Sequence, residues 1–313
     1  MFSKKQLITL QPKRIFCFGC SFTQYLWATW AEIIGYEFPD AEFYNFGKSG
    51  AGNQYIFNML MQADSVYNFT HEDLVMIQWT NVSREDRYLH AGHKGLLNTE
   101  SKHGAWSTPG NIYTQGFYDH VWLKKYFSEY GAMVRDLAFI KAAHQILKHK
   151  AQWHFLQMNN LVMYANQWDV PIKIEDNVSQ KKHGDMSRLQ QLKDIYSDTI
   201  EHLSNSFYDV LYNNNWNQKF KADRKLVNKQ FQDGHPHPLE HYDYLKRTFK
   251  HDWSARTNKG VSDLQKKWIQ LMNDASHNKD KFSIYKEERR WTDMAFYELR
   301  LRKTADPDFR LHR

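Results

Sequence analysis

The stretch that decides the fold lies near the amino end of the chain and reads Phe16-Cys17-Phe18-Gly19-Cys20-Ser21-Phe22-Thr23. It continues an apolar run that begins at Arg14, and it ends in small side chains that favour a tight turn. A buried strand that passes through such a turn into a helix presents a side chain at the helix's amino end, where free N–H groups favour negative charge. The segment therefore makes Ser21 a candidate nucleophile at the carboxyl end of a parallel strand, although a serine that only caps a helix would fit the same position.

Four short runs rich in aromatic and branched residues predict buried strands. They cover Arg14–Phe18, Glu42–Phe46, Leu74–Trp79 and Trp153–Met158. Helical patterns are predicted over Phe22–Ile34, Gln54–Ala63, Tyr118–Lys150 and Met186–Leu211. This alternation predicts an α/β fold, a three-layer α/β/α sandwich built on a flavodoxin-like parallel sheet of about five strands.

The chain is predicted to divide into a domain over residues 1–250 and a helical C-terminal extension over residues 251–313. The domain carries an irregular insertion near residues 85–119, which is too long for an ordinary connection and follows a predicted strand directly. Val261–Met272 is amphipathic, and later residues are dense in charge and aromatic rings. The extension either packs against the core or, through residues 253–313, binds a protein partner or a second copy of the chain.

Composition excludes several classes of protein. The chain of 313 residues is 42% hydrophobic and 16% aromatic, which argues against disorder. Its net charge of +7 comes from scattered Lys and Arg residues, so dedicated nucleic-acid binding is not expected. No apolar run approaches the roughly 18 residues of a membrane span, and the amino end resembles no signal peptide. We therefore expect a soluble protein that is cytoplasmic or virion-associated.

The two cysteines, Cys17 and Cys20, have the spacing of a redox pair. Cys17 falls within a predicted buried strand, however, and redox pairs usually open a helix, where the thiolate is stabilised. A second cysteine pair for zinc is missing from the sequence. We expect neither redox chemistry nor a disulfide, and no cofactor.

Further polar segments follow the predicted strands, where ligand sites gather in open parallel sheets. The second strand leads into a glycine-rich loop that contains Gly50, and the third leads into a turn that contains Asn81. A glycine N–H and an asparagine amide can both stabilise an oxyanion, although each residue is also common in plain turns.

The last polar segment reads Asp233-Gly234-His235-Pro236-His237-Pro238-Leu239-Glu240-His241. An aspartate that orients a nearby imidazole would let it accept the proton of Ser21. Alternatively, the three histidines could ligate zinc, but the prolines oppose their convergence. His241 is expected on a following helix in a supporting role.

Taken in order, these segments resemble the SGNH (GDSL-like) hydrolase superfamily over roughly residues 13–248. Its serine, glycine, asparagine and histidine blocks match Ser21, Gly50, Asn81 and His235, with Asp233 beside the histidine, and Asn45–Gly50 fits the family spacing. Cys20 replaces the family's usual aspartate before the serine, and Gly-Cys-Ser-Phe-Thr is similar to a variant from phages and environmental bacteria.

The resemblance implies an esterase in which Ser21, His235 and Asp233 form a triad and Ser21, Gly50 and Asn81 form the oxyanion hole. The spacing Asp-x-His is similar to that of SGNH-like polysaccharide acetylation enzymes, so His235 is favoured as the base and His237 is the alternative. The resemblance implies acyl esters as substrates, with O-acetyl groups on carbohydrates, and thus acylated glycans, the first expectation. Aromatic residues of the insertion such as Trp106, Tyr113 and Phe117 could stack on sugar rings or serve in packing. The alternative is a catalytically weak SGNH-like docking protein, such as a phage particle component.

Overall fold

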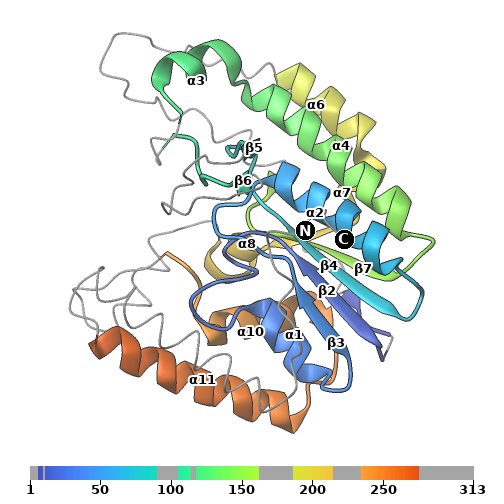
Figure 1. Cartoon of the computed structure of the whole chain (residues 1–313), viewed down its shortest axis with the longest axis vertical. Coiled ribbons are helices and arrows are strands. Elements are labelled where there is room, and N and C mark those ends of the chain that lie inside the picture. The colour runs from blue at the N-terminus through green and yellow to red at the C-terminus, as the bar shows by residue number, and fades with distance from the viewer. Residues whose placement is uncertain are drawn as a thin grey trace.

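The computed structural model describes residues 6–9, 11–89, 105–113, 118–161, 186–213 and 234–274. Its centre is a five-stranded, wholly parallel sheet in the order β3-β2-β4-β7-β8 (Figure 1). The strands are β2 (Arg14–Phe18), β3 (Glu42–Asn45), β4 (Asp73–Trp79), β7 (Gln152–Gln157) and β8 (Leu203–Ser206). Counted along the chain, this order is that of flavodoxin-like folds, which confirms the predicted class.

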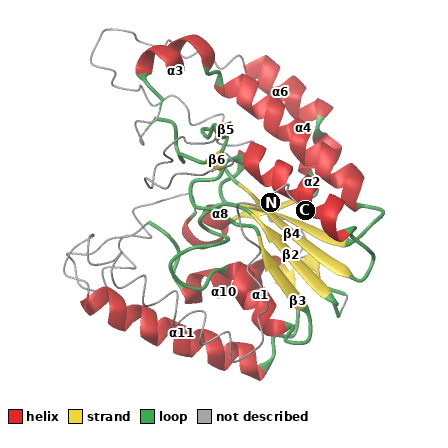
Figure 2. Ribbon diagram, viewed as in Figure 1, coloured by secondary structure: helices red, strands yellow, loops and turns green. Residues whose placement is uncertain are grey.

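Helices cover both faces of the sheet (Figure 2). One face carries α2 (Asn53–Tyr67), α4 (Glu129–Leu147), α6 (Met186–Ile195) and α7 (Ser197–Ile200), and the other carries α1 (Trp30–Glu37), α8 (Phe207–Tyr212) and α10 (Pro238–Thr248). All seven residues of β4 are buried, as expected for a central strand covered on both faces. The three-layer sandwich is therefore present.

Smaller elements lie outside the central sandwich. β1 (Gln6–Leu7) pairs in parallel with β9 (Phe249–Lys250), which brings the amino end beside the end of α10. Within the insertion, β5 (Arg87–Leu89) pairs antiparallel with β6 (Ala105–Ser107), and α3 (His120–Tyr126) follows it. Residues 90–104 and 114–117 of the insertion lie outside the described residues.

The C-terminal extension contributes one described helix, α11 (Ala255–Asp274). It lies along α1 and α10 (Figure 1), and its Trp268 and Met272 form a small apolar cluster with Leu26 and Trp27. The described part of the extension thus packs on the core. Residues 275–313 lie outside the described residues, and both docking through them and the division of the chain at residue 250 stay predictions.

Two predictions about local structure are wrong. The helix predicted over Phe22–Ile34 begins only at Trp30, because Thr29 caps it and Glu32 completes the capping box. The predicted helical stretch Met186–Leu211 is interrupted by the fifth strand, β8, whose short polar sequence carries no strand pattern. Ser21 therefore lies in a turn ahead of α1 and not at a helix N-terminus.

No helix in the described part of the chain is long and apolar enough to cross a membrane.

Candidate active site

Strand register brings the predicted site segments to one edge of the sheet. Phe18 of β2 pairs with Ile77 of β4, and Cys17 of β2 pairs with Asn45 of β3. Each segment leaves the sheet within a few residues of these pairs, so the loops that carry Ser21, Gly50 and Asn81 start side by side. The edge between β2 and β4 is where the strand order reverses, which is the usual ligand position in such folds.

The nucleophile turn is built by backbone hydrogen bonds. The N–H groups of Thr23 and Gln24 both donate to the carbonyl of Cys20, at 2.9 and 3.1 Å. Gly19 is required here, because a Cβ at that position would lie 2.0 Å from Oγ1 of Thr23. The turn leaves Ser21 mostly buried, with 6% of its surface exposed.

A buried network fixes the segment that follows Ser21. The carbonyl of Thr23 accepts from Oγ1 of Thr29 at 2.7 Å and from Nδ2 of Asn45 at 2.9 Å. The Glu32 carboxyl accepts from the same Asn45 Nδ2 at 2.7 Å and from the Thr29 N–H at 2.9 Å. Burial raises the pKa of Glu32. These bonds explain why the chain departs from a helix between Ser21 and Thr29.

The structure places His235 against Ser21, with 2.9 Å between Nε2 of the imidazole and Oγ of the serine. The two residues are 214 positions apart in the chain, so only the fold brings them together. A neutral imidazole with no proton on Nε2 can accept the serine's hydroxyl hydrogen. This is the contact that a serine nucleophile and its general base need.

Aromatic residues that the sequence analysis did not select hold His235. The ring of Tyr25 stacks on the imidazole with centroids 3.6 Å apart and planes 18° apart, and Phe22 meets it edge-on at 5.7 Å. Nε1 of Trp27 donates to the carbonyl of Pro236 at 2.6 Å. All three aromatic residues come from the segment directly after Ser21, and their density there was the available signal.

His237, the alternative base, has a structural position. It is the N-cap of α10: its Nδ1 accepts from the Glu240 N–H at 3.3 Å, and its own N–H donates to the Glu240 carboxylate at 2.9 Å. Pro238 at the first helical position and Glu240 at the third are the sequence signature of such a cap. The geometry favours His235 over His237 as the partner of Ser21.

His241 lies in α10 with 1% of its surface exposed, edge-on to Phe207 at 5.3 Å and to Phe22 at 6.3 Å. This is the supporting position expected for it. Across the described residues, no group of three or more His, Cys, Asp or Glu side chains is arranged to hold a metal ion. Asp233, the predicted orienting carboxylate, lies outside the described residues.

Gly50 lies in a tight contact with the insertion. Its φ is 78°, its carbonyl accepts from Gly110 N–H at 3.0 Å, and a Cβ would lie 2.1 Å from the carbonyl oxygen of Thr108. A left-handed φ without room for a side chain requires glycine. Asn81, after β4, is half-buried, and its Oδ1 has no hydrogen-bond partner among the described residues. No direct contact between these two residues and Ser21 is described.

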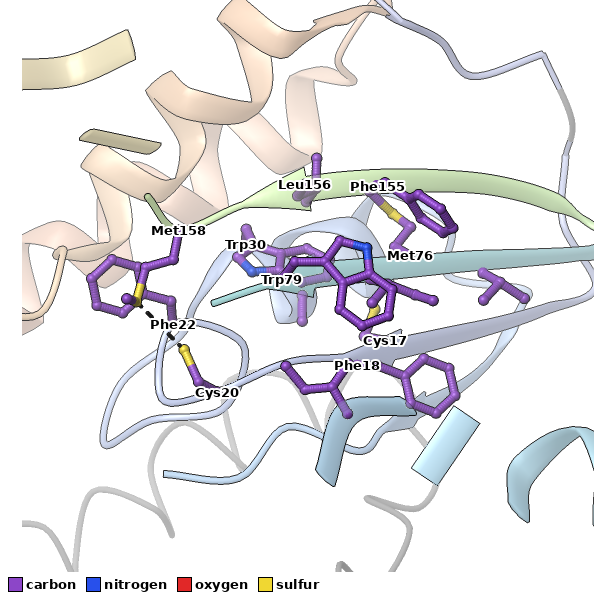
Figure 3. Close-up of a cluster of buried hydrophobic side chains, with 14 of the residues drawn as sticks. Cys17, Phe18, Cys20, Phe22, Trp30, Met76, Trp79, Phe155, Leu156 and Met158 are labelled. Carbon is purple, nitrogen blue, oxygen red and sulfur yellow. Dashed lines mark hydrogen bonds between the residues drawn. The ribbon is translucent and has the colours of Figure 1, made fainter. Parts of the chain in front are cut away.

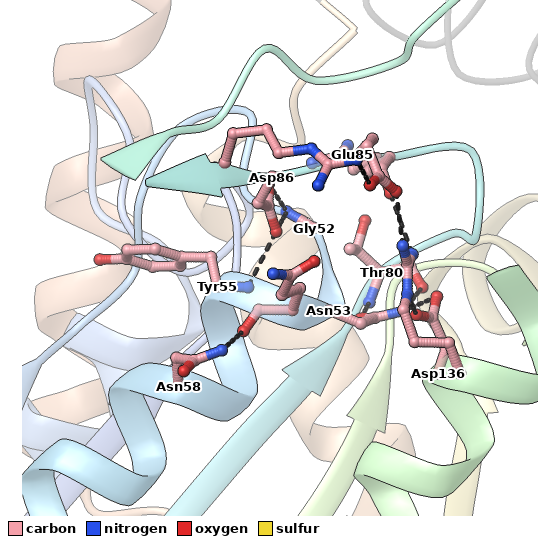
Figure 4. Close-up of polar contacts among 12 residues, drawn as sticks. Gly52, Asn53, Tyr55, Asn58, Thr80, Glu85, Asp86 and Asp136 are labelled. Atoms are coloured by element: carbon pink, nitrogen blue, oxygen red, sulfur yellow. Dashed lines mark hydrogen bonds and ion pairs between the residues drawn. The ribbon is translucent and has the colours of Figure 1, made fainter. Parts of the chain in front are cut away.

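Asp86 of the insertion holds the chain after Gly50 (Figure 4). Its carboxylate accepts from the Gly52 N–H at 2.9 Å and from the Tyr55 N–H at 2.8 Å, at the amino end of α2. Burial raises the pKa of Asp86 to about 6, although the two backbone donors oppose the rise. Arg84 adds a bond of 2.7 Å from Nη1 to the carbonyl of Ala51.

A second set of buried polar groups fixes the chain before Asn81 (Figure 4). Asn53 accepts from the Thr80 N–H at 2.8 Å and donates to the Thr80 carbonyl at 3.0 Å and to Asp136 at 2.8 Å. Arg135 bonds Asp136 at 2.9 Å and Glu85 at 2.5 Å. Burial raises the pKa of Asp136 to about 7. The loops of Gly50 and Asn81 are thereby joined to α2 and α4.

Both cysteines are free and buried. Cys20, which stands where the resembling family has aspartate, lies 3.7 Å from Sδ of Met158 inside the core (Figure 3). Burial raises the pKa of Cys17 well above its usual value, which suppresses its thiolate. The side chain at position 20 therefore packs beneath the turn, and neither cysteine has the exposed setting of a reactive thiol.

The predicted sugar-stacking residues are engaged within the protein. Trp106 packs edge-on against Tyr55 at 5.9 Å and Tyr88 at 5.6 Å. The hydroxyl of Tyr113 donates to Glu129. Phe117 lies outside the described residues.

Comparison with known proteins finds similarity at the level of structure. No protein-family model matches the chain, and no curated protein matches it. Among solved structures, it is similar to a member of the lipolytic protein G-D-S-L family from Veillonella parvula, with 15% identity, a TM-score of 0.34, and coverage of 75% of this chain and 94% of that one. We draw no conclusion about activity from a similarity at this level, so the function is inferred from the geometry above.

Proposed function

We propose that this chain is a serine esterase in which Ser21 is the nucleophile and His235 the general base. The observation that carries this proposal is the 2.9 Å contact between Oγ of Ser21 and Nε2 of His235 at the strand-order reversal of the sheet. A serine hydroxyl is a weak nucleophile unless a base lies within hydrogen-bond reach. Here the base lies within that reach.

In the proposed reaction, Oγ of Ser21 attacks the ester carbonyl while its proton passes to Nε2 of His235. The imidazolium then donates that proton to the leaving alcohol, and an acyl-serine remains. Water attacks the acyl-serine with His235 again as base, which releases the acid and restores the hydroxyl. We assign Asp233 to orient the imidazole.

The oxyanion would be stabilised by the backbone N–H groups of Ser21 and Gly50 and by the amide of Asn81. The support for this assignment is positional: the loops of all three residues leave the same sheet edge, and the last two are held by buried hydrogen bonds. For the substrate we propose acyl esters, with O-acetyl groups on carbohydrate as the class to test first.

The test is release of nitrophenol from p-nitrophenyl acetate and of acetate from acetylated glycans. Ser21→Ala and His235→Gln should lose the activity, while Ser65→Ala, whose hydroxyl bonds only to the backbone of α2, is the matched control. Equal hydrolysis by wild type and Ser21→Ala would refute the proposal. No hydrolysis of any ester by the wild type would favour the alternative, a docking protein on the same scaffold.

A further inference from the structure

We propose that Tyr25 is a positioning residue for the proposed base: its ring face holds the His235 imidazole so that Nε2 meets Oγ of Ser21. This inference rests on the proposed esterase function and adds a residue to it. The nucleophile and the surface that aligns its base then belong to one segment, four residues apart in the chain.

The contact restricts the imidazole in the direction that matters. With centroids 3.6 Å apart and planes 18° apart, the Tyr25 ring prevents His235 from tilting out of its plane. Phe22 contacts another side of the imidazole edge-on, with ring centroids 5.7 Å apart. Rotation about the Cβ–Cγ bond of His235 would carry an edge of the imidazole into the Tyr25 ring, so the stack favours the plane in which Nε2 lies 2.9 Å from the serine oxygen.

The backbone that carries His235 is held from the same segment. Nε1 of Trp27 donates to the Pro236 carbonyl at 2.6 Å, and the rings of Tyr25 and Trp27 meet edge-on at 4.7 Å. Trp268 of α11 packs on Trp27 at 5.9 Å and on His237 at 4.9 Å. The C-terminal helix thereby braces both the nucleophile segment and the histidine loop.

The stack also has an electrostatic consequence. When His235 takes the serine proton it becomes an imidazolium, and a cation over the face of an aromatic ring is stabilised by the ring's quadrupole. The contact is therefore stronger in the charged transition state than in the resting enzyme, which is the condition for a gain in kcat. Phenylalanine at position 25 would keep this face, and leucine would keep bulk without it.

The experiment compares full-length Tyr25→Phe and Tyr25→Leu with wild type, and uses the exposed Tyr126→Leu of α3 as control. Kinetics on p-nitrophenyl acetate are combined with NMR of the imidazole ring protons, assigned with His235→Gln. Stacking on Tyr25 should shift the His235 signals upfield through the ring current. Tyr25→Phe should keep this shift and most of the rate, while Tyr25→Leu should lose the shift and about 10-fold in kcat with KM little changed.

An unchanged kcat in Tyr25→Leu, or a rise in KM without a fall in kcat, would overturn the inference about Tyr25. The proposed function would still stand in that case, provided that the wild type shows Ser21-dependent activity. A wild-type spectrum without the upfield shift would overturn it as well. Absence of any Ser21-dependent hydrolysis in the wild type would overturn the proposed function itself, whatever the NMR shows.

Discussion

The two halves of the candidate site are held by different physical means. On the nucleophile side, aromatic rings surround His235: Tyr25 lies on its face, Phe22 at its edge, and Trp27 bonds the next carbonyl. On the other side, buried carboxylates hold the loops of Gly50 and Asn81 through hydrogen bonds. The contribution of a buried carboxylate to stability changes when the carboxylate titrates.

This contrast matches the two proposed roles, in which one half would move a proton and the other half would stabilise charge. The first needs one ring held in one plane, which stacking supplies. The second needs backbone groups aimed at a fixed point, and hydrogen bonds that these loops donate to buried carboxylate acceptors can hold them there. Substitutions in the two halves should therefore fail in different ways.

The largest expected effect separates the two neighbouring histidines. His235→Gln should lower kcat by about 10⁴-fold, because it removes the proposed base. His237→Gln should instead cost about 1 kcal/mol of stability through the lost cap of α10, with little effect on kcat. Steady-state kinetics and thermal unfolding of both variants check this. A larger loss of kcat in His237→Gln would reverse the assignment.

In the charge-stabilising half, Asn81→Ala should lower kcat by about 10²- to 10³-fold with KM nearly unchanged, as expected when one oxyanion donor is removed. Asn58→Ala is the matched control, because its amide bonds only to the backbone of α2. The measurement is kcat and KM on p-nitrophenyl acetate. Equal rates in the two variants would remove Asn81 from the oxyanion hole.

Asp86 should make stability depend on pH. The pKa of Asp86 in the folded state, about 6, lies above the ordinary 3.8, so the folded state binds this proton more tightly than the unfolded state does. The stabilisation that results is present at low pH and is lost as pH rises from about 4 through 6. The shift of about two units corresponds to about 3 kcal/mol. As pH rises, the free energy of unfolding of the wild type should therefore fall by about this amount relative to that of Asp86→Asn.

Urea unfolding of both proteins at several pH values measures this difference. Asp136 is present in both proteins, so its own contribution to the pH dependence largely cancels in the difference. A difference that rises with pH would mean that the hydrogen bonds from Gly52 and Tyr55 outweigh burial.

The smallest effect tests the backbone tie in the aromatic half. Trp27→Phe removes the bond to the Pro236 carbonyl and should lower kcat a few-fold and stability by about 1 kcal/mol. Trp30→Phe is the control, because it also loses an indole bond, to Gln78 at 3.0 Å. Kinetics and thermal unfolding should show a similar stability loss in both and a rate loss only in Trp27→Phe. A similar loss of rate in both would assign the effect to general packing.

Much of the fold could be predicted from the sequence, because buried parallel strands are continuous apolar runs with a strong local pattern. Four of the five sheet strands follow that pattern. The fifth, Leu203–Ser206, is short and polar and is a strand because it pairs with β7. The order of loops along the chain, together with the resemblance to SGNH hydrolases, selected Ser21 and favoured His235 over His237 as its base, since parallel strands send their carboxyl ends to one edge.

What supports the site could not be predicted in the same way. The ring of Tyr25 reaches His235 only after the chain leaves β2 without forming a helix, and apolar spacing over Phe22–Ile34 suggested the opposite. The Thr29–Glu32 capping box was the local signal that would have corrected this. The Asp86 and Asp136 bonds join segments far apart in the chain, and no local pattern encodes them.

Covalent labelling of Ser21 tests whether His235 activates this serine. The full-length protein is treated with a fluorophosphonate, which modifies an activated serine, and its peptides are examined by mass spectrometry. We expect one modification, on Ser21, that disappears in His235→Gln. An ester-hydrolysing wild-type protein whose Ser21 stays unmodified, or equal labelling of Ser21 in His235→Gln, would contradict it.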